Sequence, residues 1–425
     1  MITKFSYYIY GAKLNLLSSF SFIWLFVFSV AIFNFNHYYD LSIYSTIVFY
    51  IPIFSLSLGS YLGIKKIKIK KIKYYKHTYI VKKEINYFYF ILAYGLLVLS
   101  LIIFYIFYKV SLSYGFDLQE LRNFMFNPSY KEQREGVAIF SKLVAIIWLT
   151  TGLSYYLLFL SSFNMLYRVN FRPFHLFIIA SLSMVTLNLS MGGRLAPLFI
   201  ANYVIAFSLA VVIFNKKIKQ YLQWDGIKKF FKIIFIFMFI VILLVSFLRN
   251  SESASFVDLI LNYFIKYYTG TYYAFDQMIL TDRVNEYQNI RFGLSFWGLD
   301  TVVVSGFLRF IIGLDIPSLQ SIAAYLFQNG INISSTLRMN ATYTMLFPLY
   351  IDGGIVYISL YFIFLGYLFK KIHDSYVNKI SFISFSLMVL MYIFILNSPR
   401  NLIFSDPGIW IFLIILIFQE KIKIK

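Results

Sequence analysis

Long apolar stretches alternate with polar segments along the whole chain. A helix that crosses a bilayer needs about 20 predominantly apolar residues, and ten stretches are apolar enough to be read as such spans. They lie at residues 16–33, 41–64, 85–108, 137–167, 174–190, 195–214, 233–248, 342–369, 381–396 and 408–418. The pattern therefore predicts an all-α polytopic membrane protein with about ten transmembrane helices.

Lysine marks one side of the predicted membrane. Of the 27 lysines, all but Lys109, Lys131, Lys142 and Lys266 fall in the terminal segments or in every second loop. Positively charged loops stay in the cytoplasm, and an even number of spans places both termini there. The expected organisation is seven spans within 1–248, a large exterior loop at 249–341 and three spans within 342–425.

The large exterior loop is itself predicted to contain helices. Apolar residues recur at helical spacing over 253–268, and Pro317 begins a second helix-like stretch that runs to Gln328. Between them, 301–314 is apolar enough to dip into the bilayer as a re-entrant segment. If this segment spans instead, the sidedness of everything after it changes. A connection of this length is usually functional.

Composition excludes several classes of protein. The chain is 60% hydrophobic, 21% aromatic and only 13% charged, which is too little charge for a soluble domain. The net charge of +20 is an orientation signal and an attraction to anionic lipid headgroups, so nucleic acid is not an expected partner. There is no cysteine, and the four histidines lack ligand spacing, so neither a metal nor another cofactor is expected.

Arginine is sorted to the opposite side from lysine. Nine of the 11 arginines lie in the predicted exterior segments or at their edges, and the positive-inside rule gives no reason for this excess. A planar guanidinium group can grip a diphosphate or a carboxylate in a bidentate way that an ammonium group cannot. The exterior face is therefore predicted to hold an anionic ligand.

One exterior arginine follows a very short connection. Gly192 and Gly193 join two spans, and Arg194 comes directly after them. Two glycines permit a tight turn and a close approach of a ligand, so Arg194 is expected at the depth of a lipid diphosphate. The alternative is an arginine whose guanidinium group reaches the membrane interface without binding a ligand.

The stretch 268–276 combines aromatic rings with a carboxylate. Tyr272 and Tyr273 could pack against the apolar face of a sugar while Asp276 binds hydroxyl groups. The alternative is an ordinary aromatic belt at the membrane interface.

Further charges follow in the loop and beyond it. Arg291 and Arg338 are the preferred substrate contacts because each lies beside apolar sequence, and Arg400 lies in the last exterior segment. Asp300 is a carboxylate of the loop, and Asp352 lies two to three turns inside the eighth predicted span. An ionisable group at such depth marks a functional site by default; the alternative is that Asp352 pairs with an arginine to fix the fold.

These features together resemble the O-antigen polymerase family, also called oligosaccharide repeat unit polymerases. The resemblance rests on the hairpin at 192–194, on the large loop before the eighth span, and on Asn340-Ala341-Thr342 with Asp352-Gly353-Gly354 leading into it. It covers most of the chain as a hydropathy pattern, whereas its residue motifs are loose. It implies a GT-C-like glycosyltransferase at the periplasmic face of a bacterial inner membrane.

The resemblance also implies a reaction and its partners. A growing glycan would move from undecaprenyl diphosphate to the end of the next undecaprenyl-diphosphate-linked repeat unit, with arginines stabilising the departing diphosphate. Asp276, Asp300 and Asp352 are the unranked candidates for a general base. Membrane lipids are further partners, and a chain-length regulator is left open. The rival functions are an O-antigen ligase and a flippase for lipid-linked oligosaccharide.

Overall fold

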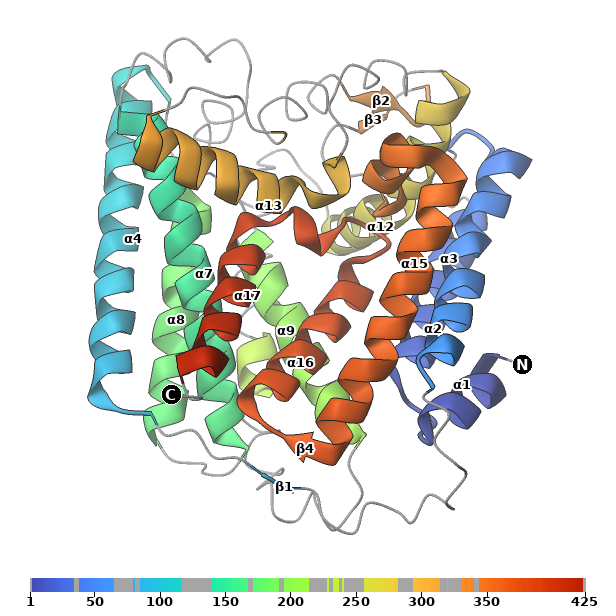
Figure 1. Cartoon of the computed structure of the whole chain (residues 1–425). Helices are drawn as coiled ribbons and strands as arrows, with labels where there is room; N and C mark the ends of the chain where they lie inside the picture. The colour runs from blue at the N-terminus through green and yellow to red at the C-terminus, as the bar shows by residue number, and fades with distance from the viewer. Residues whose placement is uncertain are drawn as a thin grey trace.

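A computed structural model places most of the chain. It describes residues 2–33, 38–64, 79–80, 85–116, 139–166, 171–190, 195–213, 228, 232–236, 239–240, 256–281, 293–313, 319, 330–335, 337–339 and 344–422. Long helices run side by side through the molecule and form a bundle (Figure 1). They are α2 (Leu16–Ile32), α3 (Ile43–Leu62), α4 (Tyr87–Ser113), α7 (Ile139–Met165), α8 (Phe171–Ser190), α9 (Leu195–Val212), α15 (Leu346–Asn378), α16 (Phe382–Asn397) and α17 (Pro407–Ile422).

These helices match the apolar stretches of the sequence. Every predicted span except that at 233–248 coincides with one of them; of 233–248, only the helical residues 233–236 and 239–240 are described. Among the described residues, five helical segments are long and apolar enough to cross a membrane. They are Ile43–Leu62, Tyr87–Ser113, Ala145–Met165, Arg172–Ser190 and Leu346–Asn378. The chain is therefore an all-α membrane protein.

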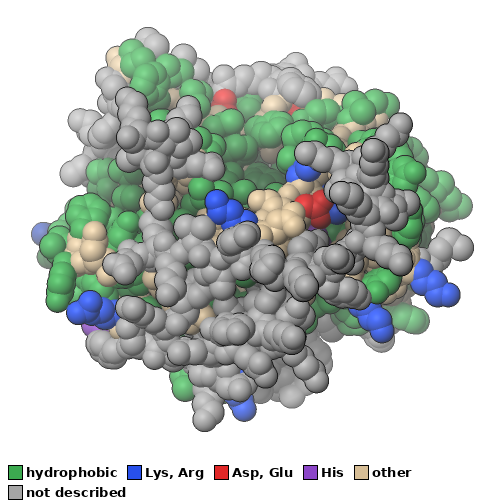
Figure 2. All heavy atoms as spheres, turned by 60° about the horizontal axis from the view of Figure 1, so that its bottom comes forward, with side chains coloured by type: hydrophobic (Ala, Val, Ile, Leu, Met, Phe, Trp, Pro, Cys, Tyr) green, Lys and Arg blue, Asp and Glu red, His purple; other side chains and the backbone are tan. Residues whose placement is uncertain are grey.

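Basic side chains lie at the lower end of the bundle. The N- and C-terminal ends both lie in the lower half of Figure 1, and the lower end carries the starts of α2 and α8 and the end of α15. Lysine and arginine side chains are scattered over this end (Figure 2). The described basic residues near these helix ends are Lys4, Lys13, Arg172, Lys370, Lys371 and Lys379. This is the end predicted to face the cytoplasm.

Shorter elements cover the two ends. At the upper end, α12 (Phe256–Leu280) packs on α2, and a hairpin pairs β2 (Ile331–Asn332) with β3 (Arg338–Met339) in antiparallel register. At the lower end, β1 (Tyr79–Ile80) pairs with β4 (Lys379–Ile380) in parallel.

A continuous helical segment at the upper end comprises η3 (Leu294–Phe296), α13 (Trp297–Thr301) and the π-helix η4 (Val302–Ile312). It lies across the ends of α7 and α17 rather than alongside them (Figure 1). Residues 301–313, the described part of the apolar stretch at 301–314, therefore do not cross the bundle. The elements after it keep the direction that the ten-span prediction gave them, because α15 begins at the upper end.

Glycines allow α3 and α15 to pack at close range. A Cβ atom on Gly59 would lie 1.9 Å from the carbonyl oxygen of Ile363, and one on Gly366 would lie 2.2 Å from that of Leu56. A Cβ atom on Gly63, one turn after Gly59, would lie 2.8 Å from the Cβ atom of Lys370. Small residues four positions apart are the usual means by which helices approach closely in a membrane. These two helices therefore form a tightly packed pair within the bundle.

The outer part of α15 is kinked. Gly354 has φ +61° and ψ −151°, a conformation that side chains other than glycine rarely adopt. The kink divides α15 into a short outer helix that ends near Asp352 and a long inner helix that continues to Asn378. Asp352 thus lies at a bend and not within a continuous helix.

Candidate functional site

A cavity opens at the upper end of the bundle, beside the hairpin. Its volume is about 580 Å³, which lies within the usual size of small-molecule sites. The residues that line it come from the α2–α3 connection, the end of α12 and the hairpin: Tyr39, Gln277, Thr281, Gly330, Ile331, Asn332 and Arg338. The lining combines an arginine with two amides, a hydroxyl and an aromatic ring, a set suited to a polar ligand that carries negative charge.

The hairpin that carries Arg338 is held in place by backbone contacts. Asn332 and Arg338 are paired across its two strands, so both side chains belong to one edge of the cavity. The Tyr39 amide donates to the Ile333 carbonyl oxygen at 2.9 Å. Gly270 of α12 leaves room for the hairpin, because a Cβ atom there would lie 3.2 Å from atoms of Ile333 and Met339.

Thr271, which follows Gly270 in α12, contacts the segment between α16 and α17. The Thr271 hydroxyl donates to the Pro399 carbonyl oxygen at 2.8 Å, and Arg400 follows directly and is 8% exposed. The Met345 amide at the start of α15 donates to the Ser398 carbonyl oxygen at 3.3 Å. One turn of α12 thus brings together the segments that carry Arg338 and Arg400, two of the arginines selected from the sequence.

The start of α9 approaches the same region. The Asn202 side chain donates to that of Asn397 at 3.2 Å, and the Ala196 amide donates to the Asn188 side chain at 3.2 Å. Four of the predicted site residues lie outside the described residues: Gly192, Gly193, Arg194 and Arg291. The upper part of α9 thus packs beside the segment of Arg400.

The two tyrosines of α12 lie in the protein interior. Tyr272 is fully buried, with its ring centroid 5.4 Å from that of Trp24 and 4.7 Å from that of Phe49. Tyr273 is 2% exposed, and its hydroxyl donates to the Ala31 carbonyl oxygen. In this arrangement neither ring offers a face to a sugar. The stretch 268–276 is part of α12, and its aromatic side chains build the contact with α2 and α3.

Asp276 caps a neighbouring helix. Its carboxylate accepts hydrogen bonds from the Ser42 amide, at 3.2 and 3.3 Å, and from the Ser42 hydroxyl. Ser42 is the N-cap of α3, and a carboxylate at that position offsets the positive end of the helix dipole. The side chain of Asp276 is fully buried. The structure thus gives this carboxylate a role in joining α12 to α3.

Asp352 holds the start of the crosswise segment. Its carboxylate accepts from the amides of Gly293, Leu294 and Ser295 at 3.0, 2.8 and 2.8 Å, and from the Ser295 hydroxyl at 2.5 Å. Tyr357, one turn further along α15, lies 3.0 Å from the same hydroxyl. The sequence suggested an arginine as the alternative partner of Asp352. A helix N-terminus takes that place, as its unpaired amides and its dipole favour an anion.

Among the residues that the structure describes, three further carboxylates of the upper end are Asp300, Asp406 and Asp40. Asp300, on α13, accepts from the Leu319 amide at 2.6 Å. Burial raises the pKa of Asp406, and hydrogen bonds from the Tyr155 hydroxyl at 2.6 Å and the Gly408 amide at 2.8 Å partly offset this effect.

Asp40 is exposed and follows Tyr39, which lines the cavity. Sequence reasoning did not select Asp40 or Asp406. The available signal for Asp40 was its place in a short exterior segment, where it is the first acidic residue of the chain.

Comparison of the chain with protein-family models, with curated proteins and with solved structures found no match. The chemistry assigned to the upper end therefore rests on its own residues and their placement.

Proposed function

We propose that this protein polymerises undecaprenyl-diphosphate-linked oligosaccharide repeat units at the outer face of a bacterial inner membrane. The observation that carries the proposal is the meeting of two exterior arginine segments on one turn of α12, beside a polar cavity. This arrangement lies at the end of the bundle opposite to Lys4, Lys13, Lys370, Lys371 and Lys379. A lipid-linked diphosphate would be found at that level, because its lipid tail stays in the bilayer.

The proposed reaction forms one glycosidic bond for each bond that it breaks. A hydroxyl oxygen at the end of one repeat unit attacks the anomeric carbon of the growing glycan, and the bond from that carbon to the diphosphate breaks. The electron pair leaves with the diphosphate, whose growing negative charge is stabilised by Arg338 and the other exterior arginines. The hydroxyl proton passes to a carboxylate.

The contacts at the upper end bear on which carboxylate acts as the base. Asp276 and Asp352 each accept several hydrogen bonds at a helix N-terminus, so their carboxylate oxygens are already engaged in joining helices. Asp300 remains a candidate, and the exposed Asp40 joins it because its neighbour Tyr39 lines the cavity. We propose that the base is one of these two.

Deletion of the gene should leave cells with surface glycan capped at a single repeat unit, visible on a gel as the loss of the long ladder. Replacing Arg338 with alanine should reduce long-chain glycan about a hundredfold, the usual cost of losing one transition-state donor. Arg338→Lys should restore little, because an ammonium group lacks the bidentate fork. Arg194→Ala and Arg194→Lys, tested in the same strain, should follow the same pattern.

Ser335→Ala is the matched control, since Ser335 is an exposed polar residue of the same hairpin. It should leave the ladder intact, and all variants should be present in the membrane in equal amounts. Complete absence of surface repeats in the deletion strain would indicate a flippase instead. Accumulation of long lipid-linked polymer would indicate a ligase.

A further inference from the structure

The first helix, α1 (Ile2–Tyr10), has two different faces. Ser6, Ile9 and Tyr10 are buried, with exposed fractions of 0%, 6% and 5%. These three positions lie on one side of a helix, since residues three and four apart are neighbours on its surface. α1 lies beside the lower ends of α2 and α3 and at an angle to both (Figure 1).

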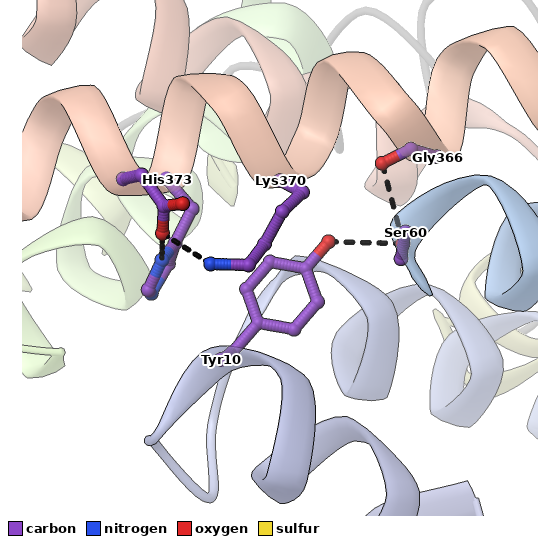
Figure 3. A network of polar contacts seen from close by, with 6 residues as sticks. Tyr10, Ser60, Gly366, Lys370 and His373 are labelled. Carbon is purple, nitrogen blue, oxygen red and sulfur yellow. Dashed lines mark hydrogen bonds and ion pairs between the residues drawn. The ribbon is translucent and has the colours of Figure 1, made fainter. Parts of the chain in front are cut away.

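Tyr10 fixes the rotation of α1 about its own axis. Its hydroxyl lies 3.0 Å from that of Ser60 on α3, and its ring meets that of His373 edge to face at 4.9 Å. The Lys370 amine lies 5.6 Å from the centre of the same ring (Figure 3), a distance at which a cation is attracted to an aromatic face. Contacts to α3 and α15 therefore keep this side of α1 turned inward.

The connection to α2 fixes the direction of α1. Gly11 ends the helix with φ +69°, and its amide donates to the Tyr7 carbonyl oxygen at 2.8 Å. Asn15 then caps α2, accepting from the Ser18 amide at 2.9 Å. A glycine stop followed at once by a capping box leaves little freedom between the two helices.

The opposite face of α1 combines aromatic side chains with a lysine. Tyr8 is 72% exposed, Tyr7 47% and Phe5 37%. Lys4 is also exposed and precedes Tyr8 by one helical turn, so the two share the outward face. Exposed aromatic and basic side chains on one short helix are typical of a helix that lies in a membrane interface.

The surrounding charge selects anionic lipid. No aspartate or glutamate precedes Asp40, and a second exposed lysine, Lys13, lies between α1 and α2. Asp374 of α15 is paired with Lys370 at 2.5 Å, so it does not offset Lys4 and Lys13. Figure 2 shows the same excess of basic side chains across this end.

We propose that α1 is seated in the headgroup layer of an anionic bilayer, where Phe5 and Tyr8 enter the interface and Lys4 and Lys13 contact lipid phosphates. This site is at the other end of the bundle from the glycan cavity and does not depend on the proposed reaction. Each lysine close to an anionic membrane surface contributes about a fivefold preference for it.

The test uses the full-length chain, which contains no cysteine. A single-cysteine variant, Tyr8→Cys, carries a photoactivated crosslinker in vesicles made of equal amounts of phosphatidylglycerol and phosphatidylcholine. We expect the crosslinker to capture phosphatidylglycerol at least about fivefold more often than phosphatidylcholine, the contribution of a single lysine. The preference should disappear when Lys4→Gln and Lys13→Gln are added, and it should weaken at high salt.

Ile43→Cys is the matched control. Ile43 is 80% exposed at the start of α3, at the other end of the bundle, and follows Asp40 in the chain. A probe there should capture both lipids equally. Equal capture at Tyr8→Cys, absence of any lipid adduct, or an adduct with a second copy of the chain would each overturn the proposal.

Discussion

Replacing Gly366 with leucine should abolish accumulation of the folded protein. A side chain there meets the backbone of α3, since its Cβ atom would lie 2.2 Å from the Leu56 carbonyl oxygen and 2.8 Å from the Ser60 amide nitrogen. Backbone atoms cannot rotate away, so α3 and α15 would have to separate. We expect a loss of about 3 kcal/mol or more, the upper end of what overpacking costs. Gly59→Leu should behave alike, as it faces the backbone of Ile363.

Gly95→Leu is the control for this prediction. Gly95 lies on the outward face of α4, and a Cβ atom there would meet no atom within 4 Å. The measurement is the amount of monodisperse protein in mild detergent, together with its thermal unfolding midpoint. Normal yield and midpoint for Gly366→Leu would show that the close packing of α3 on α15 is wrong.

Replacing Asp352 with alanine should loosen the crosswise segment from α15. Three amides and a hydroxyl would lose their shared acceptor. A hydrogen bond to a charged group contributes about 1.5–3 kcal/mol, and such contributions within one cluster do not add. We therefore expect the free energy of unfolding to fall by about 3 kcal/mol. Asp352→Asn should lose less, because the amide keeps one accepting oxygen.

A spin label on the crosswise segment reports this loosening directly. Phe307 of η4 is 53% exposed, so Phe307→Cys can carry the label without disturbing the core. The label should become more mobile in the Asp352→Ala background and stay unchanged in the Asp40→Ala background, where an exposed carboxylate is removed. An immobile label and normal stability, combined with loss of polymer, would make Asp352 a catalytic base rather than a structural acceptor.

The positions of the helices were predictable because the surroundings of a segment, lipid or water, determine which residues it can contain. A segment that crosses lipid must be apolar and helical, so hydropathy located α2, α3 and most later helices. The lower end of α15 was missed: the predicted span stops at 369, whereas the helix continues to Asn378. Hydropathy fails there because Lys370, His373 and Asp374 are polar, yet Lys370 and His373 both contact the Asp374 carboxylate and the ring of Tyr10.

The extent of α12 was also underestimated. A helix was predicted over 253–268, and α12 continues to Leu280. Gly270 and the threonines beside it have weak helix propensity, so the sequence marks a break at this point. In the folded chain, Gly270 admits the hairpin and Thr271 bonds to Pro399, so tertiary contacts decide the conformation.

The site was predictable only as a list of residue types. An excess of exterior arginine is visible in the sequence, and it singled out Arg338 and Arg400. The approach of their segments to one turn of α12 depends on contacts such as that between Thr271 and Pro399, which are 128 residues apart. No local pattern encodes such a contact. For the same reason, Asp352 was selected because an ionisable group in an apolar span is costly, whereas its partner, a helix N-terminus, is visible only in the fold.

The most direct test of the account is reconstitution of the reaction. The purified full-length protein is placed in phospholipid vesicles with undecaprenyl-diphosphate-linked repeat units from the deletion strain and no nucleotide sugar. We expect a ladder of lipid-linked oligomers, one undecaprenyl diphosphate released per new linkage, and a rate about a hundredfold lower with Arg338→Ala. Repeat units that remain single, with or without movement across the membrane, would contradict the proposed polymerase.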